Sequence, residues 1–563
     1  MKTKILIFLS IFIITTNLCA QEPVFEWAET FEIIINSLAV DEAGNSYYTG
    51  YYENTVDFDP GSGVFNLVSN GQEDIFILKL DVFGNFEWAI NYGGIGGDEG
   101  VSLVVDSVGN IYIAGEFGET LDFDPGPGVC YLVPDYYYAE FILKLDTYGN
   151  FIWAKMIDSY LGVWGNNSNI TSLKIDNNTN VYITGTLQGT VDFDPGPAIY
   201  NLTADGWSNI FLSKLNSSGE FVWAKKLDGS EESMCNSLTI GGENNIYAIG
   251  YFSDTTDFDP GPGVYNLVSE VYADIFIAKY DSLGNFVWAK RIGDIYGENA
   301  FSLAADDNEN IYYTGFFKGT VDFDPGPGVY NLVSNGSEYI FISKLSSSGN
   351  FIWAKSMGSN YQDIGYSLAL DSAYNVYTTG EFDETVDFDP GPGVYNLSSN
   401  GNDDIFISKL DSLGNFVWAR NIGGNMGDVG RNIVLDKTAN IYSSGGFDGT
   451  VDFDPGPGIY NLTEMNNAQN YFLKITQSFT ALHTNLDISC FGNSDASINI
   501  SVYNGVSPYS FLWSNGETTE DISNLGAGTY YVSITDANND LITDSVIITQ
   551  PDEFDLSFVA TDA

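Results

Sequence analysis

The chain has 563 residues, and its 75 Asp and Glu against 20 Lys and Arg give a formal net charge of −55. A surface this acidic repels nucleic acid and anionic lipid, which argues against functions that require binding to either. It suits divalent cations, cationic partners or a salty medium, and the alternative is a solubilising surface with no specific partner. The hydrophobic content of 44% can build a core, and abundant Gly, Tyr and Phe favour strands and turns.

Residues 1–20 have the pattern of a secretory signal peptide. Lys2 and Lys4 precede an apolar run at 5–14, which is too short to span a bilayer, and cleavage is expected after Ala20. Cys19 lacks the small preceding residue of a lipoprotein signal, so a lipid anchor is not expected. We therefore predict an exported protein, secreted or at the cell surface, without insertion into the membrane.

The nonapeptide Thr-Val-Asp-Phe-Asp-Pro-Gly-Pro-Gly occurs seven times in near-identical form, at a spacing of 65 residues and once of 70. A fixed period of this size makes the repeat the structural unit. In the sixth copy, strand-like runs cover 367–371, 375–380, 404–410 and 415–419. Four strands in each of seven repeats predict an all-β fold, a seven-bladed β-propeller over residues 21–476.

The motif Phe-x-Trp-Ala predicts how this fold closes. Its Trp residues are Trp27, Trp88, Trp153, Trp223, Trp288, Trp353 and Trp418. The first copy, at 25–28, precedes any complete repeat, whereas the last repeat stops after a third strand at 471–475. We expect the N-terminal strand to complete the last blade, which removes a free sheet edge. The Trp side chains are expected to pack between blades.

Length varies in only one connection of the repeat, between the Trp strand and the next first strand, where it runs from 10 to 19 residues. In a propeller this connection shares a face with the Asp-Phe-Asp-Pro-Gly loop, and variable loops on a rigid scaffold often bind ligands. Four aromatic residues there are candidates for ligand binding, with ordinary loop packing as the alternative for each. They are Tyr160, Trp164, Tyr296 and Tyr361.

The paired Asp residues allow two interpretations. Asp before Pro-Gly typically caps a turn through its carboxylate. Alternatively, two carboxylates and loop carbonyls could bind Ca²⁺, although Pro-Gly-Pro-Gly adds no side-chain oxygen. The candidate metal ligands are Asp57, Asp59, Asp122, Asp124, Asp192, Asp194, Asp257, Asp259, Asp322, Asp324, Asp387, Asp389, Asp452 and Asp454.

One Lys occupies the same third-strand position in every repeat, and we expect it to form an ion pair with a carboxylate of the repeat. These are Lys79, Lys144, Lys214, Lys279, Lys344, Lys409 and Lys474. Three Cys remain after the signal, Cys130, Cys235 and Cys490, and their odd number and irregular spacing predict no disulfide framework.

The units Gly-Asn-x-Tyr-x-x-Gly, Asp-Ile-Phe-Ile-x-Lys-Leu-Asp and Gly-Asn-Phe-x-Trp-Ala resemble the bacterial β-propeller repeats called SBBP repeats, over about residues 24–476. The resemblance implies a fold and no activity.

After a linker at 477–483, residues 484–552 show short alternating strands and turns, which predict an immunoglobulin-like β-sandwich. The segments 489–498 and 525–537 resemble the SprB-type repeat of gliding and adhesion proteins in the Bacteroidetes. That family usually has a second Cys where 538–540 reads Asn-Asn-Asp, so Cys490 is expected to be unpaired. Residues 553–563 resemble the lead-in to Cys490, so we expect a truncated further repeat and a fragment of a longer protein. Proteins of the resembled class often end in a type IX secretion sorting domain.

Three functions are compatible with the sequence. The first is an exported, non-enzymatic binding or adhesion protein: a monomeric propeller with an acidic face for an extracellular glycan or protein, and a sandwich repeat as stalk. The second is a spacer stiffened by Ca²⁺ with no ligand. The third is a propeller enzyme acting on polysaccharide, but its carboxylates recur seven times and the only His, His483, lies in the linker, so no catalytic residue is identified.

Overall fold

The computed structural model describes residues 23–135, 138–160, 168–335, 337–464, 469–477, 480–503, 508–536 and 541–551. The signal segment 1–20, Trp164 and the tail 553–563 lie outside the described residues. The chain divides into two compact units, Val24–Thr476, and Gln477–Ala563 with Met1–Pro23. All regular elements in the described ranges are strands in small antiparallel sheets, which confirms the all-β prediction. No helix within these ranges has the length and apolar character needed to cross a bilayer.

Each repeat forms one four-stranded antiparallel sheet. In the sixth repeat the order is β32 (Ile364–Leu370), β33 (Val376–Phe382), β36 (Asp404–Leu410) and β37 (Phe416–Ile422). Every residue of β36 is buried, because this central strand has protein against both of its faces. The four runs seen in the sequence are therefore the four strands of the sheet, each with slightly different limits.

The other sheets repeat this order. The first three are β2 (Ile34–Val40), β3 (Ser46–Tyr52), β6 (Asp74–Leu80) and β7 (Phe86–Tyr92); β8 (Glu99–Val105), β9 (Ile111–Phe117), β12 (Ala139–Leu145) and β13 (Phe151–Tyr160); and β14 (Asn169–Ile175), β15 (Val181–Leu187), β18 (Asn209–Leu215) and β19 (Phe221–Gly229). The fourth and fifth are β20 (Ser233–Ile240), β21 (Ile246–Phe252), β24 (Asp274–Tyr280) and β25 (Phe286–Ile292); and β26 (Asn299–Ala305), β27 (Ile311–Phe317), β30 (Tyr339–Leu345) and β31 (Phe351–Met357).

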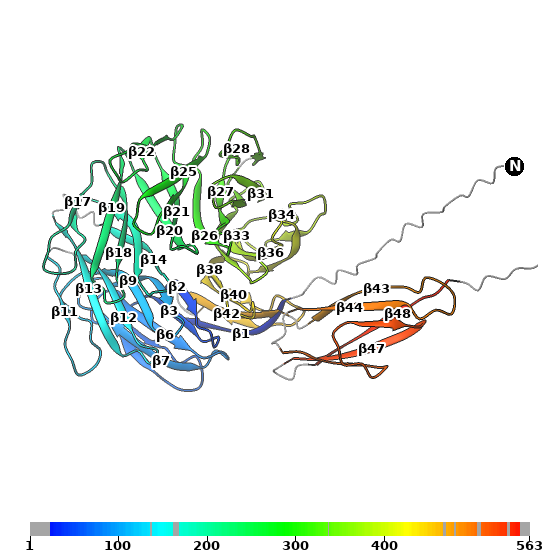
Figure 1. Ribbon diagram of the computed structural model, residues 1–563. Coiled ribbons are helices and arrows are strands. Elements are labelled where there is room, and N and C mark those ends of the chain that lie inside the picture. The colour runs from blue at the N-terminus through cyan, green and yellow to red at the C-terminus, as the bar shows by residue number, and fades with distance from the viewer. Residues whose placement is uncertain are drawn as a thin grey trace, which may run out of the picture. The chain divides into compact units, whose positions relative to one another are not determined.

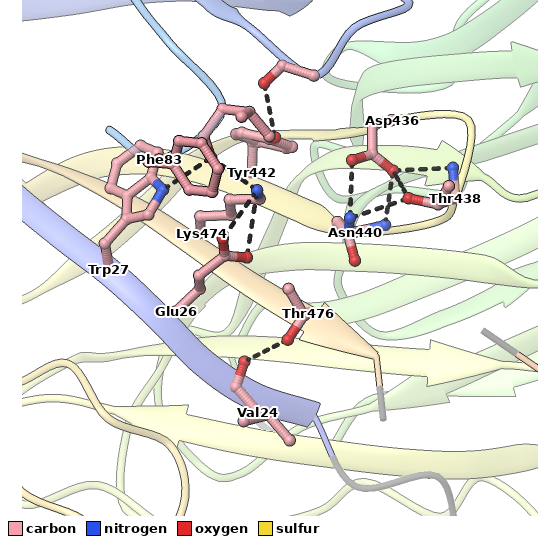
Figure 2. Close-up of polar contacts among 12 residues, drawn as sticks. Val24, Glu26, Trp27, Phe83, Asp436, Thr438, Asn440, Tyr442, Lys474 and Thr476 are labelled. Carbon is pink, nitrogen blue, oxygen red and sulfur yellow. Dashed lines mark hydrogen bonds and ion pairs between the residues drawn. The ribbon is translucent and has the colours of Figure 1, made fainter. Parts of the chain in front are cut away.

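The seventh sheet joins the two ends of the repeat region. It contains β38 (Val429–Leu435), β39 (Ile441–Phe447), β42 (Gln469–Gln477) and, beside β42, the N-terminal strand β1 (Pro23–Phe31) (Figure 1). Thr476 donates a hydrogen bond to the Val24 carbonyl at 3.3 Å, and Trp27 Nε1 donates to the Val82 carbonyl of the first repeat at 3.4 Å (Figure 2). The expected pairing of the N-terminal strand with the last repeat is therefore present.

The first strands of successive repeats lie against one another from β2 to β38, and β38 also lies against β2. A Ser in these strands links neighbours directly. The backbone N–H of Leu103 donates to Ser37 Oγ at 3.0 Å, and that of Leu173 donates to Ser102 Oγ at 3.0 Å. These hydrogen bonds fix one repeat against the next at the strand where they meet.

The Asp-Phe-Asp-Pro-Gly segment, predicted to be a loop, is a two-stranded hairpin between the second and third strands. The hairpins are β4 (Thr55–Asp57) with β5 (Asn66–Val68), β10 (Leu121–Asp122) with β11 (Tyr131–Leu132), β16 (Thr190–Asp192) with β17 (Asn201–Thr203), β22 (Thr255–Asp257) with β23 (Asn266–Val268), β28 (Thr320–Asp322) with β29 (Asn331–Val333), β34 (Thr385–Asp387) with β35 (Asn396–Ser398), and β40 (Thr450–Asp452) with β41 (Asn461–Thr463). Two of them extend the preceding sheet, because β13 and β19 are long enough to pair with β16 and β22.

The C-terminal unit has two three-stranded sheets. One contains β43 (Thr480–Leu486), β44 (Ala496–Tyr503) and β46 (Ile522–Leu525), and the other β45 (Ser510–Trp513), β47 (Gly528–Thr535) and β48 (Leu541–Ile548). Both contribute to one core around Ile498, Trp513 and Ile534, as in a β-sandwich. Residues 480–483, assigned to the linker from the sequence, lie in β43. All three described Cys are free, as expected.

Candidate functional site

The residues that recur in every repeat make internal contacts. In the sixth repeat Lys409 Nζ lies 4.8 Å from the centre of the Tyr377 ring and 3.8 Å from Asp371. The Tyr377 hydroxyl donates to Asp371 at 3.2 Å, and the Trp418 ring meets the Tyr377 ring edge-on at 6.2 Å. The buried ammonium is thus held by a carboxylate and a ring face. We call the recurrent Lys, Tyr, Trp and Asp positions the frame.

The contact between Lys and the Tyr ring recurs across the molecule, and the carboxylate that pairs with the Lys varies between repeats. The predicted ion pair is confirmed for six frame lysines, Lys79, Lys214, Lys279, Lys344, Lys409 and Lys474. Lys144 lies over the Tyr112 ring at 4.7 Å. The Trp prediction is also confirmed, because the indole of Trp288 donates to the Ser347 carbonyl of the next repeat at 3.1 Å.

One frame position is filled from a neighbouring repeat. The fourth repeat has Gly241 where the third and sixth have Asp176 and Asp371, and Glu309 of the fifth repeat takes over the missing carboxylate's contacts. Glu309 accepts hydrogen bonds from Lys279 and Tyr247, each at 2.8 Å, and from Asn245 at 2.9 Å. Burial alone would raise the pKa of Glu309, but the hydrogen bonds outweigh it and hold the pKa at about 2.

The Asp-Phe-Asp carboxylates accept backbone hydrogen bonds within their own hairpins. Asp387 accepts from the N–H groups of Asp389 and Tyr395, and Asp389 accepts from Gly391, at 2.8–3.1 Å. The central Phe388 is fully buried. The same three bonds form in the other six hairpins, as the capping interpretation requires. No three His, Cys, Asp or Glu side chains in the described residues are placed to hold a metal ion. Calcium binding stays a prediction.

The predicted ligand-binding aromatics do not form one group. Tyr296 and Tyr361 are exposed, at 42% and 50%, in the loops that lead into β26 and β32. Tyr160 is the last residue of β13 and pairs with Thr190. The side chain of Tyr160 and the whole of Trp164 lie outside the described residues.

A second set of positions differs from repeat to repeat, and we call it the rim. Each first strand has a β-bulge that leaves one residue without a strand partner: Asn36, Val101, Thr171, Asn236, Phe301, Tyr366 or Arg431. Each second strand has a single half-buried residue among buried ones: Tyr51, Glu116, Thr186, Tyr251, Phe316, Glu381 or Gly446. Bulges commonly redirect a side chain near a functional site.

Rim residues of neighbouring repeats contact one another or the start of the next first strand. Asn36 Nδ2 donates to Glu99 Oε1 at 2.6 Å, and Asn236 Nδ2 donates to Asn299 Oδ1 at 2.7 Å. The guanidinium carbon of Arg431 lies 6.0 Å from the centre of the Tyr366 ring. The rim therefore joins several repeats through side chains that the repeat itself does not dictate.

A cavity of about 190 Å³ opens at the rim between the first and second repeats. It is lined by Tyr51, Glu73, Gly97, Asp98, Glu99, Glu116 and Tyr138, with no basic side chain among these described residues. Burial raises the pKa of Asp98 to about 6 and also raises the pKa values of Glu99 and Glu116. A cationic group in this cavity would relieve the repulsion among its four carboxylates.

A further carboxylate, buried in the second repeat, lies near the cavity residue Glu116. Glu140 of β12 is buried, where five of the other repeats have Ile and the last has Asn470. Burial and the neighbouring Glu116 raise its pKa well above the ordinary value. This site is not predicted by the features that the repeats share. Comparing the seven copies position by position would have found the rim as the place where they differ.

Comparison with known proteins gives one family match, to the SprB repeat, over residues 486–518. The curated relatives include an uncharacterized WD repeat-containing protein, L264, of Acanthamoeba polyphaga mimivirus, 26% identical over 458 residues and 70% of this chain. They also include the regulatory protein FlaEY of Caulobacter vibrioides, 22% identical over 311 residues and 52% of this chain. The chain spans 32% of the length of each relative.

Two solved structures show weak likeness. A protein of unknown function from Bacteroides caccae has 9% identity and a TM-score of 0.29, covering 59% of this chain and 85% of its own. The extracellular domain of a B. thetaiotaomicron hybrid two component system, BT4673, has 10% identity and a TM-score of 0.17, covering 93% of this chain and 100% of its own. Likeness at these TM-scores supports no conclusion about this protein's fold or function.

Proposed function

We propose that the unit Val24–Thr476 is a seven-bladed β-propeller of the SBBP type, closed by its N-terminal strand. Three features support this: seven sheets in chain order, each with four long strands and two of them extended by a hairpin, the placement of β1 beside β42, and the contact of β38 with β2. In a closed ring the first strands of neighbouring sheets lie against one another, which leaves only short, protected edges where an isolated sheet would expose an open one.

We further propose that the protein is an exported, non-enzymatic binding protein of the cell surface or medium. The propeller would bind an extracellular glycan or protein at its rim, and the SprB-like repeat would serve as stalk. The observation that carries this proposal is the contrast within each repeat, where the frame residues recur while the rim residues differ. On a rigid scaffold, side chains that no packing requirement fixes are available for recognition.

The acidic cavity gives the proposed ligand a chemical character. Four carboxylates in a cavity whose described lining holds no basic side chain favour an ammonium or guanidinium group over an anion. A cavity of about 190 Å³ is larger than a single ion requires, which fits the end of a lysine or arginine side chain or an amino-substituted sugar.

Calorimetric titration of the full chain with hexalysine and with glucosamine hexamer, at low and high salt, tests this function. We expect saturable binding that weakens with salt and falls at least tenfold in the double variant Glu99→Gln/Glu116→Gln. Glu42→Gln, which alters an exposed carboxylate in a turn, is the matched control and should bind as the parent does. Equal binding by the double variant and the control would mean that the cation binds outside the cavity. Absence of binding by the parent protein would favour the alternative function of a spacer without a ligand.

A further inference from the structure

Three aromatic rings lie together at the rim of the fifth and sixth repeats. Phe301 in β26 has its ring centre 6.0 Å from that of Phe316 in β27 and 5.2 Å from that of Tyr366 in β32. All three side chains are half-buried, so part of each ring faces solvent. We call this group the aromatic platform.

Charged groups border the platform. The Tyr366 hydroxyl donates to Glu381 Oε1 at 3.1 Å, and the Arg431 guanidinium lies over the Tyr366 ring. Arg431 is exposed, and it is the only basic residue in the rim set defined above. The platform thus combines flat apolar faces with a carboxylate and a guanidinium at its edge.

Packing of the repeat does not require these rings. The positions equivalent to Phe301 hold Thr171 and Asn236 in the third and fourth repeats, and the position of Phe316 is Gly446 in the seventh. Sheets with small or polar residues there have the same strand order and the same bulge. A cluster of partly exposed aromatic side chains, unlike scattered single ones, is typical of a binding surface.

The loops beside the platform also carry aromatic residues. Tyr296 and Tyr361, both exposed, lie five residues before Phe301 and Tyr366 in the connections that enter β26 and β32. These two candidates from the sequence are therefore carried by the same pair of repeats as the platform.

We propose that the aromatic platform is a stacking site for a sugar ring of a neutral glycan. This inference rests on the proposed binding function and names its ligand class. A sugar ring offers an apolar face that stacks on Phe301 and Tyr366, and hydroxyl groups that hydrogen-bond to Glu381 and Arg431 at the edge. The net charge of −55 disfavours polyanionic glycans.

A glycan fits the platform better than a protein partner does. Three half-buried rings expose far less than the roughly 800 Å² that each partner buries in a standard protein–protein interface. A single sugar ring needs only a platform of ring size with a few polar groups around it.

The test is binding of the full chain to immobilised cellulose, xylan, mannan, starch and chitin, with polygalacturonate as the anionic comparison. We expect saturable binding to at least one of the five neutral polymers and none to polygalacturonate. Phe301→Ala and Tyr366→Ala should each weaken that binding about tenfold, whereas Tyr366→Phe should retain it within about threefold because the ring remains. Tyr148→Ala, at a turn tip where the side chain is 77% exposed, is the matched control.

Thermal unfolding of each variant distinguishes a loss of ligand binding from a loss of folded structure. Full binding by Phe301→Ala and Tyr366→Ala would overturn the aromatic platform as the site, and so would binding to none of the neutral polymers. If the cavity variant Glu99→Gln/Glu116→Gln still weakens hexalysine or glucosamine-hexamer binding in that case, the proposed binding function stands without the stacking site. Absence of glycan binding at the platform together with absence of cation binding at the cavity would contradict both the stacking site and the proposed binding function.

Discussion

Two tyrosines of the sixth repeat, Tyr366 and Tyr377, show how the frame differs from the rim. Tyr377 is fully buried under Lys409, donates to Asp371, and is matched by Tyr in all seven repeats. Tyr366 is half-buried at a bulge, and the matching residues are Asn, Val, Thr, Asn, Phe and Arg. At a position where the side chain contacts a buried charge, all seven repeats have the same residue. Where it only borders solvent, the sequence is free to serve another purpose.

We expect the largest effect from removing the N-terminal strand that completes the seventh sheet. Deleting residues 23–31 removes strand β1 and with it the buried side chains of Trp27, Ala28 and Phe31. The edge of β42 would then be open, and Lys474 would lose Glu26, 3.2 Å away. We expect loss of cooperative thermal unfolding, or a midpoint lowered by more than 10 °C, measured by circular dichroism.

Removal of residues 1–20 alone is the control for this deletion and should leave the midpoint unchanged. A protein lacking 23–31 that unfolds at the parent's temperature would show that β1 does not complete the last sheet.

Glu309 of the fifth repeat supplies a carboxylate to the fourth repeat, and this arrangement allows a rescue experiment. Glu309→Gly should lower the free energy of unfolding by about 1–3 kcal/mol, because Lys279, Asn245 and Tyr247 lose their shared acceptor. Adding Gly241→Asp restores the residue pattern of the other repeats, and the double variant should recover most of the loss in urea unfolding. A double variant no more stable than Glu309→Gly would contradict this assignment.

Because of its buried carboxylates, we expect the protein to become more stable as the pH falls from alkaline towards mildly acidic values. Burial raises the pKa of Glu298 to about 9 and those of Asp363 and Asp404 to about 7, above the ordinary values near 4 of the unfolded chain. A group with a raised folded pKa binds its proton more tightly when folded. Its stabilising contribution is therefore complete below about pH 4 and is lost as pH rises through the folded value. We expect the unfolding midpoint to rise between pH 9 and pH 5.

Glu298→Gln sharpens this prediction. Glu298 Oε2 accepts from the Asp294 N–H, whereas Oε1 has no hydrogen-bond partner among the described residues. The amide keeps the acceptor and removes the titration, so we expect a flatter pH profile and a small stabilisation at pH 9 or above. An unchanged slope would mean that Glu298 does not contribute to it.

Much of the fold could be predicted from the sequence because packing repeats itself. The central strand β36 is apolar along most of its length and ends at a turn, and these signals occur seven times. The hairpin of β34 and β35 was missed because each strand has only three residues, too short for a clear alternation, although Val386 is buried.

The candidate site was predicted less well. Tyr296 and Tyr361 were chosen because they lie in loops of variable length, but neither Phe301 nor Glu116 was chosen, since each lies within a regular strand. A β-bulge is not visible in a single strand sequence, because it depends on pairing with the neighbouring strand. The cavity similarly needs side chains from two repeats, whose separation only the fold determines.

The most direct test of the account is the free energy of unfolding in urea of Tyr366→Ala beside Tyr377→Ala. The two variants make the same chemical change in the same sheet. We expect Tyr377→Ala to cost about 3–5 kcal/mol, as for a buried aromatic residue, and Tyr366→Ala to cost about 1 kcal/mol or less. Equal losses would show that the rim is part of the structural core, and would contradict the separation between a frame that folds the protein and a rim that recognises its ligand.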